Sequence, residues 1–195
     1  MTIKQVFVIG AGQMGSGIAQ VCAQAGYAVT LNDLNEEAIN RGIQAITKNV
    51  SRDVEKGRKS EDEKAQILAN IQTSLTLEDA KFADIVIEAA VENMEIKQKI
   101  FKQLDELTEA HTILATNTSS LPITEIAAVT NRPEKVIGMH FMNPVPVMKL
   151  VEIIRGLATN DETFEAVAQM TAKLDKTGVE VNDFPGFISN RIYYQ

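Results

Sequence analysis

The chain has 195 residues, which allows one α/β domain and little more. Its hydrophobic fraction of 45% is normal for a soluble globular protein, and no apolar run approaches the roughly 18 residues needed to span a bilayer. The formal net charge of −7 argues against general attraction to nucleic acid. An anionic ligand would therefore have to be held by a local basic patch or by backbone N–H groups.

The cysteine content and the first residues bear on the compartment. Cys22 is the only cysteine, which excludes an intrachain disulfide and a cysteine-based metal site, and we interpret it as a small core residue. Met1 to Gln5 lead directly into a strand pattern, which leaves no room for a signal peptide. We expect a cytoplasmic protein with no membrane segment and no bound metal.

Short β-branched or aromatic runs alternate with longer helical patterns along most of the chain. The short runs predict strands at residues 6–9, 27–31, 71–75, 84–88, 112–116, 136–141, 150–154 and 179–181. Helices are predicted at residues 14–25, 36–56, 93–107 and 161–176, with one more after a Ser-x-x-Glu capping box at Ser60. The helices from Glu36 and Ser60 should form a hairpin insertion over about residues 36–71. This alternation predicts an α/β fold with a doubly wound, mostly parallel, Rossmann-type sheet.

Residues 10–15 read Gly-Ala-Gly-Gln-Met-Gly, a G-x-G-x-x-G pattern that follows a strand and opens a helix. That context makes the pattern specific for a dinucleotide. Gly10 permits the tight turn, Gly12 has no Cβ to block the pyrophosphate, and Gly15 lets the helix pack close to the strand. The free N–H groups at the helix start, where Gln13 and Met14 lie, would hold the phosphates.

Asp33 ends the second predicted strand, where a carboxylate accepts hydrogen bonds from the ribose hydroxyls of NAD. It would also repel the 2′-phosphate of NADP, and no arginine follows it, since Leu34 and Asn35 come next. The alternative is an ordinary strand–helix turn followed by an ordinary helix-leading acid. The joint context of loop and carboxylate favours NAD as the cofactor.

Three more polar residues lie near the ends of later strands. Ser119 follows the strand at 112–116, His140 lies in the strand at 136–141, and Glu152 lies in the next strand, twelve residues after His140. Ligands of open α/β sheets gather at the carboxyl ends of strands, so Ser119 and His140 are candidates to face the crevice of the nicotinamide. Each also has a structural alternative: a core histidine, a turn hydroxyl and a surface carboxylate.

Three segments resemble one enzyme family. Asn-Thr-Ser-Ser-Leu-Pro-Ile at 117–123 looks like the active-site loop of the L-3-hydroxyacyl-CoA dehydrogenases. Residues 138–152 resemble their signature segment almost residue for residue, and residues 185–191 are similar to the motif that opens their second domain. The resemblance extends from the first strand to the last residue, and the 3-hydroxybutyryl-CoA dehydrogenase branch fits best.

The resemblance implies catalytic roles that the chemistry supports. His140 would be the general base, or the acid in the reverse direction, because imidazole titrates near neutral pH. Glu152 would orient the His140 ring and stabilise its charged form. Ser119 and Asn190 would hydrogen-bond the substrate oxygen, although Asn190 could also be a helix residue with no substrate contact.

The same resemblance implies further contacts. It places Glu92, Lys97 and Asn143 near the cofactor, together with Ser119. The family carries a CoA-binding hairpin where this chain has four cations, Arg52, Lys56, Arg58 and Lys59. Such a charge run is usually a solvated face. Because Lys56 aligns with a CoA contact, we expect it to bind the CoA phosphates, with Arg52 or Lys59 assisting.

Asp183 to Gly186 is the best candidate for a domain boundary, since Pro185 and Gly186 break both preceding patterns. We expect an NAD-binding domain at residues 1–184. Residues 185–195 would be the start of an all-helical domain that, by resemblance, completes the substrate cleft and forms a homodimer. This chain is then expected to bind NAD but to turn substrate over poorly. His111, the only other histidine, matches no motif and is interpreted as a surface residue.

Two other functions remain open from the sequence. One is a relative that acts on a free hydroxy acid, such as the gulonate dehydrogenase and λ-crystallin branch. The basic hairpin argues against it, because a free acid needs no grip on CoA. The other is a nucleotide-binding fragment without useful catalysis. The sequence gives neither the acyl chain length nor the dominant direction of the reaction.

Overall fold

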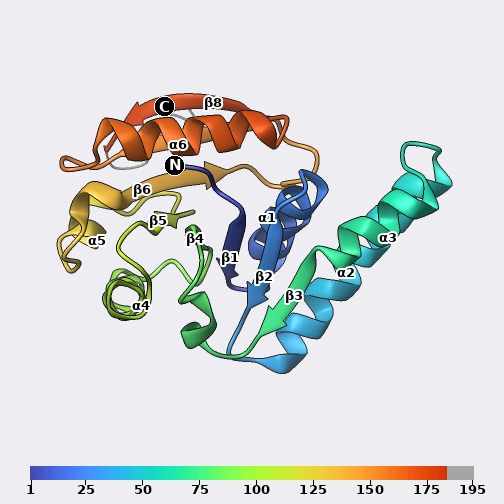
Figure 1. Ribbon diagram of the computed structural model, residues 1–195, viewed down its shortest axis with the longest axis horizontal. Coiled ribbons are helices and arrows are strands. Elements are labelled where there is room, and N and C mark those ends of the chain that lie inside the picture. Colours follow the sequence, from blue (N-terminus) through green and yellow to red (C-terminus); the bar gives the residue numbers. More distant parts are fainter. Residues whose placement is uncertain (184–195) are drawn as a thin grey trace.

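The computed structural model describes residues 1–183, so Asn190 and the segment from Pro185 lie outside the described residues. Within residues 1–183 the chain forms an eight-stranded sheet with the order β3-β2-β1-β4-β5-β6-β7-β8 and helices on both faces (Figure 1). The strands are β1 (Gln5–Ile9), β2 (Ala28–Asn32), β3 (Ile71–Ser74), β4 (Ile85–Glu88), β5 (Ile113–Thr116), β6 (Val136–Phe141), β7 (Leu150–Arg155) and β8 (Thr177–Asn182). The helices are α1 (Gln13–Gln24), α2 (Glu36–Glu55), α3 (Glu61–Ala69), α4 (Met94–Leu107), α5 (Ile123–Ala127) and α6 (Asp161–Lys173), with short 3₁₀ turns at Leu77–Ala80 and Pro133–Lys135.

The predicted doubly wound, mostly parallel sheet is confirmed. Strands β1 to β6 are parallel to one another, β7 runs antiparallel to β6, and β8 is parallel to β7. The reversal at β7 follows from the length of the connection, because residues 142–149 are too few for the crossover that parallel neighbours need. The strand order reverses between β1 and β4, which is where open α/β sheets bind ligands.

Alternate residues of β1 belong to two different cores. Val6 and Val8 point into the core under α1, α2 and α6, whereas Phe7 and Ile9 point into the core under α4 and α5. All four side chains are at most 5% exposed. A central strand buried on both faces carries no polar position, which explains its continuous apolar sequence.

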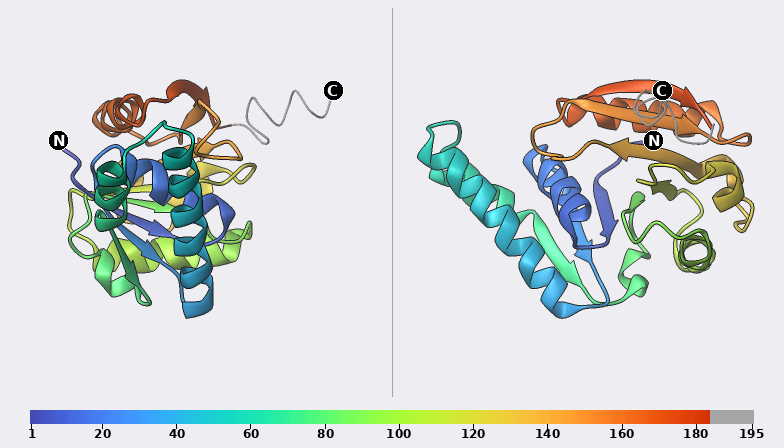
Figure 2. Two further views of the ribbon diagram at one scale, coloured as in Figure 1. Left: turned by 90° about the vertical axis from the view of Figure 1, so that its right-hand side faces the viewer. Right: turned by 180° about the vertical axis from the view of Figure 1, so that it is seen from behind.

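The predicted helical hairpin is formed by α2 and α3, which run side by side and project from the body of the molecule at the β3 edge (Figures 1 and 2). Helix α3 begins with the predicted capping box. The Ser60 hydroxyl accepts the N–H of Glu63, and the Glu63 carboxylate accepts the N–H of Ser60. Gly57, with a φ of 71°, supplies the left-handed residue of the turn between the helices.

The last helix and strand differ from the prediction. Helix α6 ends at Lys173 and not at Lys176, because residues 174–176 form a turn in which Asp175 has a φ of 60°. The final strand is correspondingly longer than predicted and starts at Thr177. Helix α5 was not predicted, because it has only five residues, of which Ile123, Thr124 and Ile126 are β-branched.

Cys22 lies in the middle of α1 and is fully buried, as predicted. Burial raises the pKa of its thiol to about 12. Within residues 1–183, none of the helices combines the length and the apolar composition that crossing a membrane requires.

Candidate cofactor and active site

The three glycines of the loop after β1 meet three different surroundings. Gly10 has a φ of 99°, and a Cβ there would lie 2.6 Å from the carbonyl oxygen of Ala89, directly after β4. A Cβ at Gly15 would collide with the carbonyl of Gly10. A Cβ at Gly12 would meet nothing within 4 Å. The first and third glycines therefore allow close packing, and the second keeps open space above the start of α1.

The start of α1 has the polarity that phosphate groups need. Gly12 is the N-cap and contributes no side-chain oxygen, and the first turn contains no acidic residue. The backbone N–H groups of Gln13, Met14 and Gly15 precede the first intrahelical bond, which Ser16 donates to Gly12. Unfilled donors at the positive end of a helix fit a pyrophosphate.

Asp33 lies directly after β2, beside this loop. Its Oδ2 accepts the N–H of Ala11 at 3.0 Å, and its Oδ1 accepts the N–H of Asn35 at 3.0 Å. These bonds hold the carboxylate at the carboxyl edge of the sheet, within reach of a ligand that lies on the glycine loop. The residues present thus fit a dinucleotide at both the phosphate position and the ribose position.

Two cavities meet at the end of β4. The larger, about 990 Å³, is lined by Gly10, Gly12 and Asp33 among others, and the smaller, about 330 Å³, is lined by Met14, Ser119 and His140 among others. Both share Ala89 and Ala90 as lining residues. They form one track across the switch point of the sheet, long enough for a ligand with two halves.

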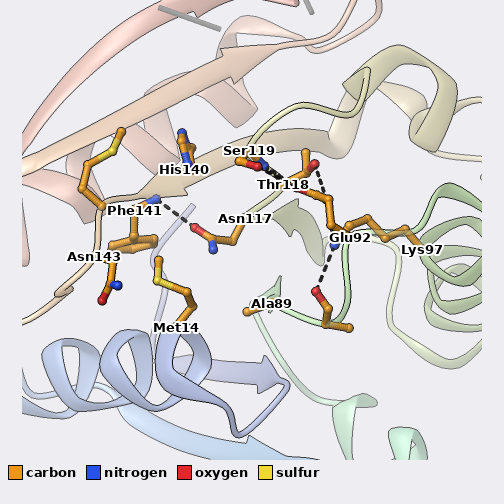
Figure 3. Close-up of a pocket in the computed structure, with 12 residues that line it drawn as sticks. Met14, Ala89, Glu92, Lys97, Asn117, Thr118, Ser119, His140, Phe141 and Asn143 are labelled. Atoms are coloured by element: carbon orange, nitrogen blue, oxygen red, sulfur yellow. Dashed lines mark hydrogen bonds and ion pairs between the residues drawn. The ribbon is translucent and has the colours of Figure 1, made fainter. Parts of the chain in front are cut away.

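His140 and Glu152 are directly opposite each other on the antiparallel strands β6 and β7. The Nδ1 of His140 lies 3.0 Å from Oε1 of Glu152, and the two residues are 8% and 1% exposed. Cross-strand neighbours face each other closely, so the β6–β7 pairing sets this contact. Glu152 is therefore not a surface carboxylate. His140 is nearly buried, as a core histidine would be, but it also lines the smaller cavity (Figure 3).

Glu92 holds the loop that carries Ser119. One of its carboxylate oxygens accepts both the N–H and the hydroxyl of Ser119 at 2.8 Å, and the other accepts the hydroxyl of Thr118 at 2.7 Å. Burial alone would raise the pKa of Glu92, but these hydrogen bonds and the nearby Lys97 lower it below its ordinary value. Glu92 is thus ionised near neutral pH and keeps Ser119 at the rim of the cavity.

Lys97 connects this loop to a buried acid that the sequence analysis missed. Its Nζ lies 2.7 Å from Glu88 and 3.6 Å from Glu92, and both Lys97 and Glu88 are almost fully buried. Glu88 also accepts the hydroxyl of Thr116 and the N–H of Ala90, each at 2.7 Å. A charged residue that ends an otherwise apolar strand, nine positions before a lysine, was the available signal in the sequence.

Asn143 lies in the connection between β6 and β7 and lines the His140 cavity (Figure 3). In that view Asn143 and Met14 lie on one side of the cavity and Glu92 and Lys97 on the other. Asn117 joins the ends of β5 and β6, because its Oδ1 accepts the N–H of Phe141 at 2.8 Å. The structure therefore brings residues that the sequence analysis singled out together at one cavity, namely Met14, Glu92, Lys97, Ser119, His140 and Asn143.

The four hairpin cations do not share one environment. Asp53 pairs with Lys59 at 3.4 Å and with Arg58 at 3.7 Å, whereas Arg52 and Lys56 are exposed. Asn49, Arg52 and Lys56 recur at helical spacing along α2. Asn49 lines a third cavity, of about 460 Å³, between α1, α2 and the segment from Asn143 to Pro146. The face of α2 thus leads from that cavity toward Lys56.

The remaining histidine lies away from this cavity. His111 is about 40% exposed, and its Nε2 lies 2.9 Å from Oδ1 of Asp84 at the amino end of β4. It is therefore a surface residue, as predicted, with an acidic partner. Among residues 1–183, no three His, Cys, Asp or Glu side chains gather in a way that could hold a metal ion.

The fold and the track define a dinucleotide-binding domain of the Rossmann type. The family model described as "3-hydroxyacyl-CoA dehydrogenase, NAD binding domain" matches residues 5–184. The chain belongs to this family, as the sequence resemblance predicted, and NAD is the cofactor that the matched domain binds.

Three relatives show the degree of similarity. A probable 3-hydroxybutyryl-CoA dehydrogenase of Bacillus subtilis is 61% identical over 192 residues, which cover 98% of this chain and 67% of the relative. The 3-hydroxybutyryl-CoA dehydrogenase of Bradyrhizobium diazoefficiens is 50% identical over 97% of this chain and 65% of the relative. The crystal structure of (S)-3-hydroxybutyryl-CoA dehydrogenase from Ralstonia eutropha superposes with a TM-score of 0.96 at 46% identity, covering 98% of this chain and 68% of that one. The chain thus spans about two thirds of the length of these relatives.

Proposed function

We propose that the protein containing this chain interconverts an (S)-3-hydroxyacyl-CoA and a 3-ketoacyl-CoA with NAD, in fatty-acid or butanoate metabolism. The favoured pair is 3-hydroxybutyryl-CoA and acetoacetyl-CoA, the substrate class named for the relatives. The observation that carries the proposal is the buried His140–Glu152 pair, whose histidine lines the cavity that continues the dinucleotide track. NAD bound in that track would accept or return the hydride.

The His140–Glu152 pair supports proton transfer. A carboxylate can only accept a hydrogen bond, so Nδ1 of His140 carries the proton toward Glu152 and Nε2 exchanges the proton of the substrate hydroxyl. In the oxidising direction His140 takes that proton, and Glu152 stabilises the imidazolium. In the reducing direction His140 returns it to the carbonyl oxygen.

Ser119 is proposed to bind the substrate oxygen, with Asn190 as a second donor from outside the described residues. In this structure the Ser119 hydroxyl donates to Glu92. To donate to the substrate it has to rotate away from that carboxylate, and its backbone N–H bond to Glu92 then keeps the loop in place. Glu92, Lys97 and Asn143 are proposed to contact the nicotinamide half of the cofactor, since all three line the same cavity.

The CoA moiety is proposed to follow the face of α2. Lys56 and Arg52 are exposed cations close to the negative end of that helix, so they are available to bind phosphate. Lys59 is a weaker candidate than the sequence suggested, because Asp53 already compensates its charge. A free hydroxy acid would use none of these residues.

A domain at residues 1–184 is proposed to bind the cofactor, and the segment from residue 185 is proposed to begin the helical domain that shapes the acyl pocket and forms a homodimer. The share of the relatives that this chain spans supports the idea that they carry further structure. Turnover by this chain alone is then expected to be slow, because Asn190 has to be held within about 1 Å of its place.

The test is steady-state oxidation of NADH with acetoacetyl-CoA and, separately, with free acetoacetate, by a version of the chain that carries the family's helical domain. Wild type should use acetoacetyl-CoA in preference, and His140→Gln should lower its kcat by about 10²–10⁴-fold with little change in NADH affinity. Lys56→Glu should raise KM for acetoacetyl-CoA, while the matched Arg58→Glu, at the hairpin turn, should not.

Cofactor choice gives a second readout. NADPH should bind about 10- to 1000-fold more weakly than NADH because of Asp33. The proposal is wrong if His140→Gln retains the full rate. Equal use of acetoacetyl-CoA and free acetoacetate would contradict the CoA assignment and favour the free-acid alternative.

A further inference from the structure

The connection between β6 and β7, residues 142–149, is held at few points. It joins the strand of His140 to the strand of Glu152 and carries Asn143. Most of it is exposed, and Val145, at 2% exposure, is its buried side chain. Val145 packs against Gly17 of α1, where an added Cβ would lie 2.8 Å from the Val145 Cβ. The connection therefore lies between the two catalytic strands and the helix proposed to bind the cofactor.

Lys176 reaches this connection from the turn between α6 and β8. Its Nζ donates to the carbonyl of Val145 at 2.7 Å and to the carbonyl of Met148 at 2.6 Å. Both bonds are charge-assisted and short, which places them among the stronger hydrogen bonds in proteins. Burial, followed by the nearby Lys149, lowers the pKa of Lys176, and the nearby Asp175 offsets part of this shift.

The turn that presents Lys176 is itself well fixed. The N–H of Lys176 donates to the carbonyl of Thr171, a fully buried residue of α6. Beside it, the N–H of Thr177 donates to the carbonyl of Lys149, which pairs β8 with the end of the connection. Lys176 thus ties the exposed connection at residues 142–149 to the well-fixed end of α6.

The two acceptor carbonyls belong to one tight turn. The N–H groups of Val147 and Met148 both donate to the carbonyl of Pro144, at 3.0 and 2.9 Å. Lys176 binds this turn at Val145 and at Met148, so it fixes the orientation of the turn as a whole. Pro144 follows Asn143 directly, so the orientation of the turn determines where Asn143 lies on the cavity wall.

We propose that Lys176 is a positioning residue, which sets the place of Asn143 and of the cavity wall from Asn143 to Pro146 for the cofactor. It touches neither cofactor nor substrate and acts through the backbone of the turn. The functional part of this proposal rests on the proposed NAD-dependent activity, whereas the structural part does not. Without Lys176 the connection would have to be ordered when NADH binds, at a cost in conformational entropy.

The experiment compares Lys176→Met, Lys176→Arg and Lys149→Met with wild type in two measurements. One is the dissociation constant of NADH by fluorescence titration. The other is hydrogen exchange at the amides of Val147 and Met148 without ligand. Lys149→Met is the matched control, because it removes a neighbouring ammonium that donates to the exposed Asp175 and to neither the Val145 carbonyl nor the Met148 carbonyl. Thermal unfolding of each variant monitors the global fold.

Lys176→Met should exchange these two amides faster and bind NADH about tenfold more weakly, a change of roughly 1.4 kcal/mol. Lys149→Met should stay within about twofold of wild type in both measurements. Lys176→Arg, which keeps the charge and the donors, should restore most of the NADH affinity. A loss of NADH affinity without a matching fall in melting temperature, together with the rescue by Lys176→Arg, distinguishes a positioning role from a general loss of stability.

Unchanged amide exchange in Lys176→Met would overturn the proposal at its structural step. Faster exchange with unchanged NADH affinity would overturn the functional step. Failure of wild type to bind NADH would instead contradict the proposed function, and the exchange measurement would still decide whether Lys176 holds the turn.

Discussion

Two buried ion pairs, each between a basic and an acidic side chain, hold the two ends of helix α4. Near its start, Lys97 pairs with Glu88 at 2.7 Å. Near its end, Asp105 pairs with Arg132 at 2.8 Å. All four side chains are at most 10% exposed. The Lys97–Glu88 pair lies at the carboxyl edge of the sheet, and the Arg132–Asp105 pair lies at the amino edge. The two pairs can therefore be compared to separate effects on stability from effects on cofactor binding.

The surroundings of the two pairs differ. Arg132 directs its remaining donors to four backbone carbonyls, those of Asp105, Thr108, Glu109 and Thr112, and so closes the end of α4. Lys97 lines a cavity and contacts Glu92, which holds Ser119. The comparison teaches that burial and pairing do not distinguish a structural ion pair from a functional one. The difference lies in whether the cation is saturated by backbone or faces a cavity.

The largest effect is expected for Lys97→Met. It leaves Glu88 buried without its cation, which should lower the free energy of unfolding by about 3–5 kcal/mol. Because Lys97 also lines the His140 cavity, NADH should bind at least about tenfold more weakly. Urea unfolding followed by circular dichroism and NADH titration of the folded fraction measure the two effects. Unchanged NADH affinity would make this pair structural as well, and the comparison would fail.

Arg132→Ala should match that loss of stability without the loss of binding. It leaves Asp105 and several carbonyls without their partner, at a similar cost of about 3–5 kcal/mol. The dissociation constant of NADH should stay within about twofold of wild type when measured well below the melting temperature. A tenfold weaker NADH affinity in this variant would show that the amino edge is coupled to the site.

The double variant Glu88→Gln with Lys97→Met sharpens the contrast. No charge is then left buried, so the loss of stability should fall to about 2 kcal/mol or less. The oxygen of glutamine can accept the N–H of Ala90, and its NH2 group can donate to the hydroxyl of Thr116, both of which bond to Glu88 in the wild type. NADH affinity should remain as weak as in Lys97→Met. Recovery of binding in the double variant would mean that the single variant failed only through instability.

The smallest effect is expected for Asp84→Asn, at the amino edge. Burial alone would raise the pKa of Asp84, but the N–H groups of Gln5 and Lys4 and the side chain of His111 lower it. Its folded pKa therefore lies below the unfolded value of about 3.9, and its stabilising effect is present above that pH and is lost as the pH falls through the folded pKa.

Asp84→Asn should accordingly lower the free energy of unfolding by roughly 1 kcal/mol at pH 7. Below about pH 4 the variant should lose less stability with falling pH than wild type does. Unfolding midpoints from pH 7 to pH 3 check this. If the stability of Asp84→Asn falls as steeply at low pH as that of wild type, other carboxylates cause the pH dependence. NADH affinity should not change, as for Arg132→Ala.

The sequence predicted the elements that local patterns determine. The glycine loop, the capping box at Ser60 and the apolar strands each depend on a few adjacent residues, and each was found at or near its predicted place. The antiparallel β7 could also have been predicted, because eight residues cannot form a parallel crossover. Helix α5 could not, since a five-residue helix is stabilised by packing rather than by propensity.

The polar network under the site was beyond the sequence analysis for a different reason. Arg132 and Lys176 contact residues that are distant in the sequence, through geometry that the fold creates. Glu88 lies only nine residues before Lys97, so the sequence held a signal for that pair. Lys176 was even assigned to the preceding helix. Family resemblance pointed to the residues that are proposed to touch ligands, whereas the contacts of Arg132 and Lys176 became visible only with the structure.

The burial of Cys22 gives the chain a built-in reporter of unfolding. Thiol reagents attack the thiolate, and a thiol that is enclosed in α1 with a pKa of about 12 will react only when the domain opens. Because the chain has one cysteine and no tryptophan, labelling yields a single adduct per unfolding event, and NADH emission carries no tryptophan background. Pulsed labelling can therefore rank the stability of the variants in the same samples in which cofactor fluorescence measures their binding.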